Sequence, residues 1–211
     1  MIRLLPAVTG FVAAASLICA TIAPARADTE EPRHTVVAKI GAIEIRQYGP
    51  RLAADVIMQG DEEDAQSDGF RALADYIFGN NTARSKIAMT APVAQERSEK
   101  VAMTAPVAQT REGGAWRVRF FMPSKYTRET LPQPNNQAVQ IVEVPGETMA
   151  VLRFSNSRSA EAVAIQTAAL LRGLEGSRWT AAGAPVTWLY DPPWTLPFFR
   201  RNEVAVAVKA R

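Results

Sequence analysis

Cysteine and histidine are almost absent from this chain of 211 residues, which contains one of each, Cys19 and His34. A single cysteine allows no intramolecular disulfide, no thiolate zinc site, no iron–sulfur cluster and no Cys-x-x-Cys-His haem attachment. A Ser-His-Asp hydrolase would have to recruit His34, and the chain has no Gly-x-Ser-x-Gly motif. We therefore expect a protein that is not an enzyme and has no metal site of its own.

The first 27 residues have the pattern of a secretory signal peptide. Residues 4–22 form an apolar run, and Ala25-Arg26-Ala27 places small residues at both positions that a signal peptidase reads. We expect cleavage before Asp28, which leaves a mature domain over 28–211 in the periplasm or outside the cell. The run is of borderline length for a membrane span, so a retained anchor is the alternative. After cleavage we expect no stable membrane insertion.

The charge of the predicted mature chain is nearly balanced. It keeps 22 of the 24 basic residues, because Arg3 and Arg26 leave with the signal peptide, and all 21 acidic ones. The formal net charge therefore falls from +3 to +1, which gives little support to a nucleic-acid partner. A chain of this length can bury one core, so we expect a single domain.

Two strands and a helix are predicted in the first half. Residues 43–46 (IEIR) and 52–57 (LAADVI) read as strands joined by the turn Tyr48-Gly49-Pro50. The acids at 61–64 favour a helix start, because they complement the positive end of the helix dipole, and Gly79 follows the predicted helix. Apolar side chains recur between these points at helical spacing: Phe70, Leu73, Ala74 and Ile77.

The second half repeats this order. Residues 138–141 (AVQI) match residues 42–45 (AIEI) at an offset of 96, and residues 149–154 form the next predicted strand. Ser159 is the expected cap of a second helix, which Gly176 ends. Its apolar face consists of Val163, Thr167, Leu170 and Leu174.

Further strands are predicted over 117–122, 186–190 and 204–209. Together with the elements above they give two copies of a strand–strand–helix–strand unit. This arrangement predicts an α+β fold, in which a distorted antiparallel β-barrel is flanked by two helices and carries a pseudo-twofold internal duplication.

A shorter, nearly exact repeat lies in the first half. Residues 86–95 (KIAMTAPVAQ) return as residues 100–109 with one change, Ile87 to Val101. Alternation through 87–89 and 101–103 predicts the two adjacent strands of a hairpin, and each proline should end regular pairing. The paired methionines could be plain core residues or could soften the wall of an apolar pocket.

An aromatic, proline-rich loop at 191–201 separates the last two predicted strands. Trp194, Phe198 and Phe199 lie there beside Arg200 and Arg201. Two interpretations remain open. The aromatic residues could cap the core, or they could present a flat apolar floor with cationic edges, which suits a planar dianionic ligand.

Four segments resemble the SOUL haem-binding protein family and occur in its order: residues 43–56 (IEIRQYGPRLAADV), 86–93 (KIAMTAPV), 119–126 (RFFMPSKY) and 190–204 (YDPPWTLPFFRRNEV). With the leader, the chain resembles a bacterial member that has a signal peptide and an extended, doubled hairpin. The family implies a distorted barrel with two helices, which binds haem or a related tetrapyrrole non-covalently in a shallow apolar cleft beside the first helix. By matching position, the resemblance implies these cofactor-binding residues: Phe70, Arg71, Ala74, Phe78, Trp194 and Arg200.

The haem iron has no evident ligand in this sequence. Some family members have a histidine where this chain has Gln47, which is a poor haem ligand. His34 lies at the start of the domain, and Met89, Met103 and Tyr48 could coordinate iron only in principle. We expect binding through apolar contact and arginine–propionate pairs, without axial ligation.

The predicted function is that of a periplasmic or secreted carrier, buffer or scavenger of haem or related porphyrins. One alternative is a binding module for another amphipathic small molecule in the same cleft. A second alternative is interaction with a protein or a membrane surface through the aromatic loop.

Overall fold

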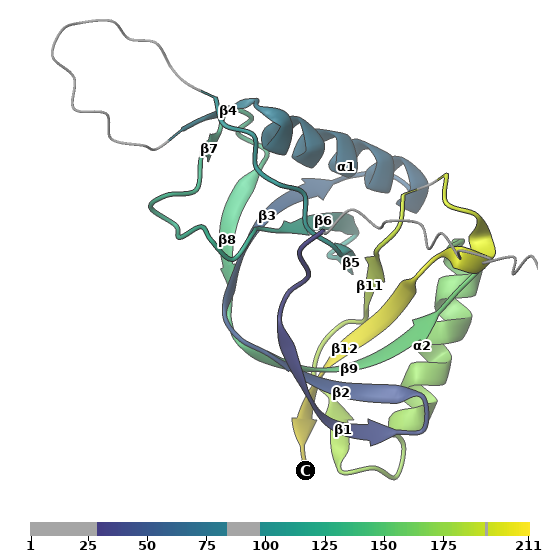
Figure 1. Cartoon of the computed structure of the whole chain (residues 1–211). Coiled ribbons are helices and arrows are strands. Elements are labelled where there is room, and N and C mark those ends of the chain that lie inside the picture. The colour runs from purple at the N-terminus through teal and green to yellow at the C-terminus, as the bar shows by residue number, and fades with distance from the viewer. Residues whose placement is uncertain (1–28, 84–97, 193) are drawn as a thin grey trace, which may run out of the picture.

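The computed structural model describes residues 29–83, 98–192 and 194–211. Within them the chain forms one large curled sheet and two helices, which confirms the α+β class (Figure 1). The helices are α1 (Glu62–Phe78) and α2 (Ala160–Leu174). The strands are β1 (His34–Ile40), β2 (Ile43–Tyr48), β3 (Arg51–Met58), β4 (Asn81–Thr82), β5 (Val107–Glu112), β6 (Ala115–Phe121), β7 (Gln133–Pro134), β8 (Gln140–Val144), β9 (Glu147–Phe154), β10 (Trp179–Ala181), β11 (Val186–Leu189) and β12 (Asn202–Ala210).

The large sheet is antiparallel and follows the order β1-β2-β9-β12-β11-β5-β6-β3-β8, with β10 paired to β12. Although β2 and β3 are consecutive, they do not pair with each other. Instead β2 pairs with β9 and β3 pairs with β8, so each strand joins one from the second half. Among the described residues β1 and β8 remain the two edges of the sheet. A closed barrel is therefore not found, and the predicted distorted barrel is not confirmed.

The core consists of three apolar clusters on the two faces of the sheet. Successive strand residues point to opposite faces, so Ala54 and Val56 of β3 pack toward α1, whereas Ala53 faces the concave interior. The cluster under α2 is built in the same way, from Ile43 and Ile45 of β2 and their neighbours. The helices thus cover the outer face, and the third cluster lines the concave face between the two halves.

Helix α1 begins and ends where the sequence predicts. The Asp61 side chain accepts a hydrogen bond from the backbone N–H of Asp64 at 3.0 Å, and Gly79 closes the last turn with a φ of 129°. Leu73 and Ile77 are buried, as predicted, but the Phe70 side chain lies at the edge of the buried face and is 38 % exposed. The apolar stripe of the helix therefore divides into a buried row and an exposed row.

Helix α2 also matches its prediction. The Ser159 side chain accepts a hydrogen bond from the backbone N–H of Ala162 at 3.3 Å. Leu170 and Leu174 are buried, and Val163 packs beside them half-buried. The helix packs against β9 and β12, in the cluster that also contains Ile43.

The doubled segment does not form the predicted pair of strands as far as it is described. Its first copy, residues 86–95, lies outside the described residues. In the second copy, residues 101–103 are not a strand, and β5 begins only at Val107. The backbone N–H of Val101 instead donates to the carbonyl of Ile77 at the end of α1, at 2.9 Å, and Pro106 has no N–H to donate to a ladder.

Strands β1 and β10 are not predicted from the sequence. Both lie at margins of the sheet, where only one neighbour is present. Val36 and Val37 of β1 are 40 % and 41 % exposed, so the strand lacks the alternation that marks a half-buried strand.

Candidate functional site

The predicted cleft-side residues of α1 form an exposed apolar row. Phe70, Ala74 and Phe78 follow one another at four-residue spacing, which places them on one side of a helix. Phe78 is 60 % exposed and Ala74 is half-buried. The Phe70 ring packs edge-on against the buried Phe120 ring, with centroids 5.3 Å apart. The row is thus anchored at one end and open to solvent at the other.

Arg71 lies on the neighbouring surface of α1. Its guanidinium forms an ion pair with Asp68 one turn earlier, and the arginine side chain is 75 % exposed. An exposed pair of this kind contributes little to stability, so it leaves the guanidinium able to turn toward an anionic group. Arg71 is therefore accessible for the role that the family resemblance implies.

The loop between β11 and β12 presents its aromatic side chains to solvent. Trp194, Phe198 and Phe199 are 83 %, 60 % and 67 % exposed, so they do not cap the core. The backbone beneath them is fixed, because Arg200 Nε donates to the Thr195 carbonyl at 2.7 Å and the Pro197 carbonyl accepts from Asn156 N–H at 2.8 Å. Of the two interpretations of this loop, the exposed apolar surface is the one that the structure supports.

The α1 row and the aromatic loop are connected to neighbouring parts of the same sheet. Leu189, the last residue of β11, pairs with Val107 of β5, and Val107 packs into the cluster beneath α1. Among the described residues no ring contact joins the two segments, because Phe70 packs on Phe120 and Phe198 packs on Phe199, with centroids 4.5 Å apart in the second pair. The six residues therefore remain a predicted site, divided between α1 and the loop.

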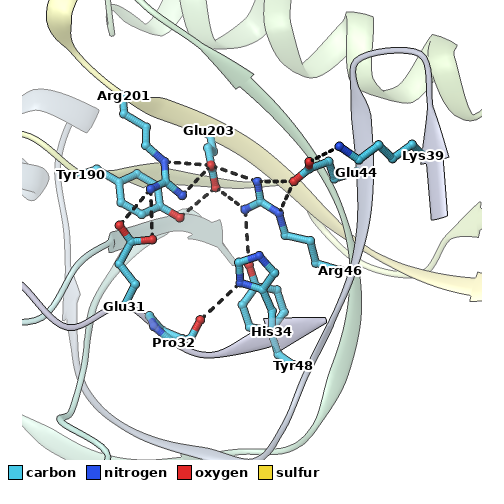
Figure 2. A network of polar contacts seen from close by, with 10 residues as sticks. All are labelled: Glu31, Pro32, His34, Lys39, Glu44, Arg46, Tyr48, Tyr190, Arg201 and Glu203. Carbon is cyan, nitrogen blue, oxygen red and sulfur yellow. Dashed lines mark hydrogen bonds and ion pairs between the residues drawn. The ribbon is translucent and has the colours of Figure 1, made fainter. Parts of the chain in front are cut away.

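A buried polar network crosses the concave face and was not foreseen from the sequence (Figure 2). Glu203 is fully buried and accepts hydrogen bonds from Arg46 Nη1 at 2.8 Å, Arg201 Nη2 at 3.0 Å and the Tyr190 hydroxyl at 2.8 Å. Arg201 also forms an ion pair with Glu31 at 2.8 Å, which connects the N-terminal segment to the end of the loop just before β12. The available signal was the placement of charged residues two positions apart, Glu44 with Arg46 and Arg201 with Glu203.

Burial by itself raises the pKa of the Glu203 carboxyl, but the hydrogen bond and charge of Arg46, followed by the charge of Arg201, outweigh that effect. The pKa of Glu203 therefore lies below its ordinary value. Burial, reinforced by the charge of Glu203, raises the pKa of the Tyr190 hydroxyl. At neutral pH Glu203 is thus a carboxylate and Tyr190 a neutral hydrogen-bond donor.

A pocket of about 650 Å³ opens beside this network. It is lined by residues of the segments 30–33, 49–52, 121–128 and 143–145, together with Thr104. A small adjoining recess is lined by Tyr48, Trp188 and Tyr190 among others. Neither cavity includes any of the six predicted cofactor-binding residues. Because four distant segments build it, sequence reasoning did not find it.

The candidate iron ligands are scattered. His34 is exposed at the start of β1, where its ring lies 5.1 Å from that of Tyr48. Tyr48 is itself buried, and its hydroxyl accepts from Arg46 Nη1 at 3.5 Å. Met103 is 39 % exposed in the segment before β5, and Met89 lies outside the described residues.

The described part of the chain has neither a cluster of metal-binding side chains nor a helix that could span a membrane. In it, no group of three or more His, Cys, Asp or Glu side chains is arranged to hold a metal ion. None of the helices in residues 29–83, 98–192 and 194–211 has both the length and the apolar character needed to cross a bilayer.

Known structures share the fold at low sequence identity. The C-terminal domain of EcmrR superposes with a TM-score of 0.53 at 10 % identity, covering 80 % of this chain and 98 % of that one. A hydrolase from Listeria innocua superposes with a TM-score of 0.51 at 16 % identity, covering 82 % and 94 %. At such identities the likeness concerns the fold alone. No curated protein matches the sequence.

The sequence itself matches one family. The model of the SOUL heme-binding protein family aligns with residues 29–207, which is most of the chain and nearly all of the described part. The aligned region contains α1, the aromatic loop and most of the sheet. The chain belongs to the SOUL heme-binding protein family.

Proposed function

We propose that this protein binds haem or a related tetrapyrrole non-covalently and acts as a carrier, buffer or scavenger. The observation that carries the proposal is membership of the SOUL heme-binding family over residues 29–207. The proposal includes a periplasmic or secreted location, with residues 1–27 removed as a signal peptide and 28–211 forming the domain. The pattern of an apolar run followed by Ala25-Arg26-Ala27 supports that location.

The proposed site is the exposed apolar surface of α1 together with the aromatic loop. A tetrapyrrole is a flat apolar ring with carboxylates on one edge, so it needs aromatic or aliphatic contact and cationic partners. Phe70, Ala74 and Phe78 supply the contact on α1, and Trp194 supplies it on the loop. Arg71 and Arg200 are the proposed partners of the carboxylates. These residues fit the apolar ring and the carboxylates of the group, and none of them would ligate its iron.

We also propose that the two halves derive from an internal duplication. The exchange of strands supports it, because β2 pairs with β9 of the other half and β3 with β8, as a twofold axis between the halves requires. The positions of the helices agree, since α1 packs on β3 and β6 while α2 packs on β9 and β12. No enzymatic turnover and no nucleic-acid partner are part of the proposal.

Titration of the purified protein with haemin, followed at the Soret band, tests the main proposal. Saturable one-to-one binding is expected. The double variant Phe70→Ala/Phe78→Ala should bind about tenfold more weakly or worse, because each lost aromatic contact is worth roughly 1 kcal/mol or more. Ile165→Ala, which removes an exposed apolar side chain of α2, is the matched control and should leave the affinity unchanged. Absence of saturable binding would refute the proposal.

A second candidate function is docking to a membrane surface, favoured by the exposed side chains of the loop: Trp194, Leu196, Phe198 and Phe199. Co-sedimentation with vesicles of phosphatidylcholine and phosphatidylglycerol separates the two functions. Vesicle binding that Trp194→Ala/Phe198→Ala abolishes, without saturable haemin binding, would replace the haem proposal. Haemin binding without vesicle binding supports it.

A further inference from the structure

The 650 Å³ pocket beside the β2–β3 turn has the size of a small-molecule site, since such sites usually measure about 300–1,000 Å³. Its lining residues include none of those proposed to contact haem. The apolar part of its wall comes from Leu52, Phe121, Met122 and Val144. The N-terminal segment forms part of the rim, where the backbone N–H of Ser124 donates to Glu30 Oε1 at 2.9 Å.

Arg51 lines both this pocket and the adjoining recess, and its guanidinium is held in a fixed position. It lies between the rings of Tyr48 and Phe121, with distances from Cζ to the ring centroids of 4.5 Å and 4.6 Å. Its Nη2 forms an ion pair with Glu147 Oε1 at 2.5 Å. The two ring contacts and the single carboxylate therefore account for the faces and the Nη2 of the guanidinium, and they leave Nε and Nη1 without a hydrogen-bond partner among the described residues.

Those remaining donors have no partner. The Arg51 side chain is only 10 % exposed, and its Nε and Nη1 are buried and donate no hydrogen bond to any described residue. A buried donor left unpaired costs about 1–3 kcal/mol, and more on a charged group. Burial, aided by the charge of Arg119, lowers the pKa of Arg51 despite the neighbouring Glu147. An acceptor supplied by a ligand would remove both penalties.

The acidic residues on the rim already have partners. Glu31 pairs with Arg201 at 2.8 Å and Glu143 with Arg128 at 3.8 Å. Arg33 adds a further cation to the lining, and its charge lowers the pKa of Glu30 in addition to the larger effect of the Ser124 hydrogen bonds. The charge of the rim therefore does not oppose an anion at Arg51.

We propose that this pocket binds an organic carboxylate with an apolar body, whose carboxylate oxygens accept hydrogen bonds from Nε and Nη1 of Arg51. The apolar body lies against Leu52, Met122 and Val144. The site is separate from the surface proposed for haem, and the two ligands bind independently.

The test uses 11-(dansylamino)undecanoic acid, whose fluorescence rises in an apolar site, and its methyl ester, with protein purified after expression of the full chain. Saturable binding of the acid, displaced by decanoate, is expected. Arg51→Gln should weaken the acid roughly tenfold to hundredfold, because hydrogen bonds to a charged group are worth about 1.5–3 kcal/mol. The ester should bind weakly to both proteins.

A second variant avoids the buried arginine. Ser124 is exposed at the rim, so Ser124→Trp should obstruct the pocket and abolish binding of the acid while the melting temperature stays unchanged. Ser124→Ala is its control and should bind normally. Equal affinity for the acid and its ester, unchanged binding in both Arg51→Gln and Ser124→Trp, or no binding by the wild type would each overturn the proposal.

The haem and carboxylate readouts are independent. Ser124→Trp should titrate with haemin like the wild type, and Phe78→Ala should bind the dansyl acid like the wild type. Loss of haemin binding with retained binding of the acid refutes only the haem proposal. If Ser124→Trp lost both ligands, they would share one site and the separate carboxylate site would be wrong.

Discussion

Arg46 and Glu203 lie 157 positions apart in the sequence and form a bidentate ion pair on the concave face of the sheet. Arg46 Nη1 donates to Oε2 at 2.8 Å and Nη2 donates to Oε1 at 3.2 Å. Glu203 has no exposed surface and Arg46 is nearly buried. The pair joins β2 to β12 across β9, which lies between them in the sheet.

Removing the buried carboxylate should be costly. Glu203→Ala leaves the buried Arg46 and the half-buried Arg201 without their shared partner, and breaking a buried pair in this way costs about 3–5 kcal/mol. Glu31→Gln is a suitable control, because Glu31 pairs with the same Arg201 but is 42 % exposed, and it should cost no more than about 1 kcal/mol. Urea unfolding followed by circular dichroism measures both free energies. Similar values for the two variants would contradict this account.

Stability should also fall in acid because of Glu203. Its folded pKa lies below the ordinary value of 4.5, since the contacts with Arg46 and Arg201 outweigh the opposing effect of burial. The unfolded chain thus binds the proton more readily. The stabilisation is fully present above about pH 4.5 and is lost as the pH falls through the lower folded pKa.

Melting temperatures between pH 7 and pH 3 measure this effect. In Glu203→Gln the decline below pH 5 should be shallower than in the wild type, because one linked group is missing. A residual slope should remain, since the hydrogen bond from Lys39 likewise lowers the pKa of Glu44. A decline as steep as that of the wild type would show that Glu203 is not the linked group.

Two helical glycines should respond oppositely to alanine. A Cβ at Gly69 of α1 would lie 2.5 Å from Val118 Cγ2 and 2.8 Å from Val118 Cβ, both on a buried strand. At Gly173 of α2 the close contact is with Cδ1 of Ile43, the end of a flexible side chain, and the next atom is 3.7 Å away.

Alanine improves helix propensity by about 1 kcal/mol, whereas overpacking a core costs about 1–3 kcal/mol. Gly69→Ala should therefore lower the free energy of unfolding, and Gly173→Ala should leave it unchanged or raise it slightly. Thermal unfolding of the two variants beside the wild type decides the point. A stabilised Gly69→Ala protein would mean that α1 can move away from the sheet.

Iron should contribute little to tetrapyrrole affinity. The described candidate ligands are scattered over the fold, with His34 at an exposed strand end and Tyr48 buried against Arg46. Iron-free protoporphyrin, followed by fluorescence, should bind within about threefold of haemin, which is a difference below 1 kcal/mol. His34→Ala and Met103→Leu should leave the Soret band in place. A six-coordinate spectrum that either change abolishes would identify an axial ligand.

Local structure was predictable because its signals are short-range. Asp61 and Ser159 cap their helices through hydrogen bonds to residues three positions later, so a few consecutive letters suffice to place each helix start. Strands β2, β3, β6, β9 and β12 were likewise predicted from short apolar runs bounded by turn residues. The family motifs are also properties of the sequence alone.

The long-range arrangement was decided only by the tertiary structure. Periodicity shows that Arg46 and Glu203 point to one face of their strands, but not that these strands lie near each other. The pocket at Arg51 requires four separate segments to meet, and its unpaired donors follow from that meeting. Residues 101–103 alternate like a strand, yet the carbonyl of Ile77 at the end of α1 takes the N–H of Val101. The sequence determined caps, strand faces and family, because these depend on neighbouring residues. The order of the strands in the sheet determined which side chains meet. The residue pattern of a strand does not show which other strand it pairs with.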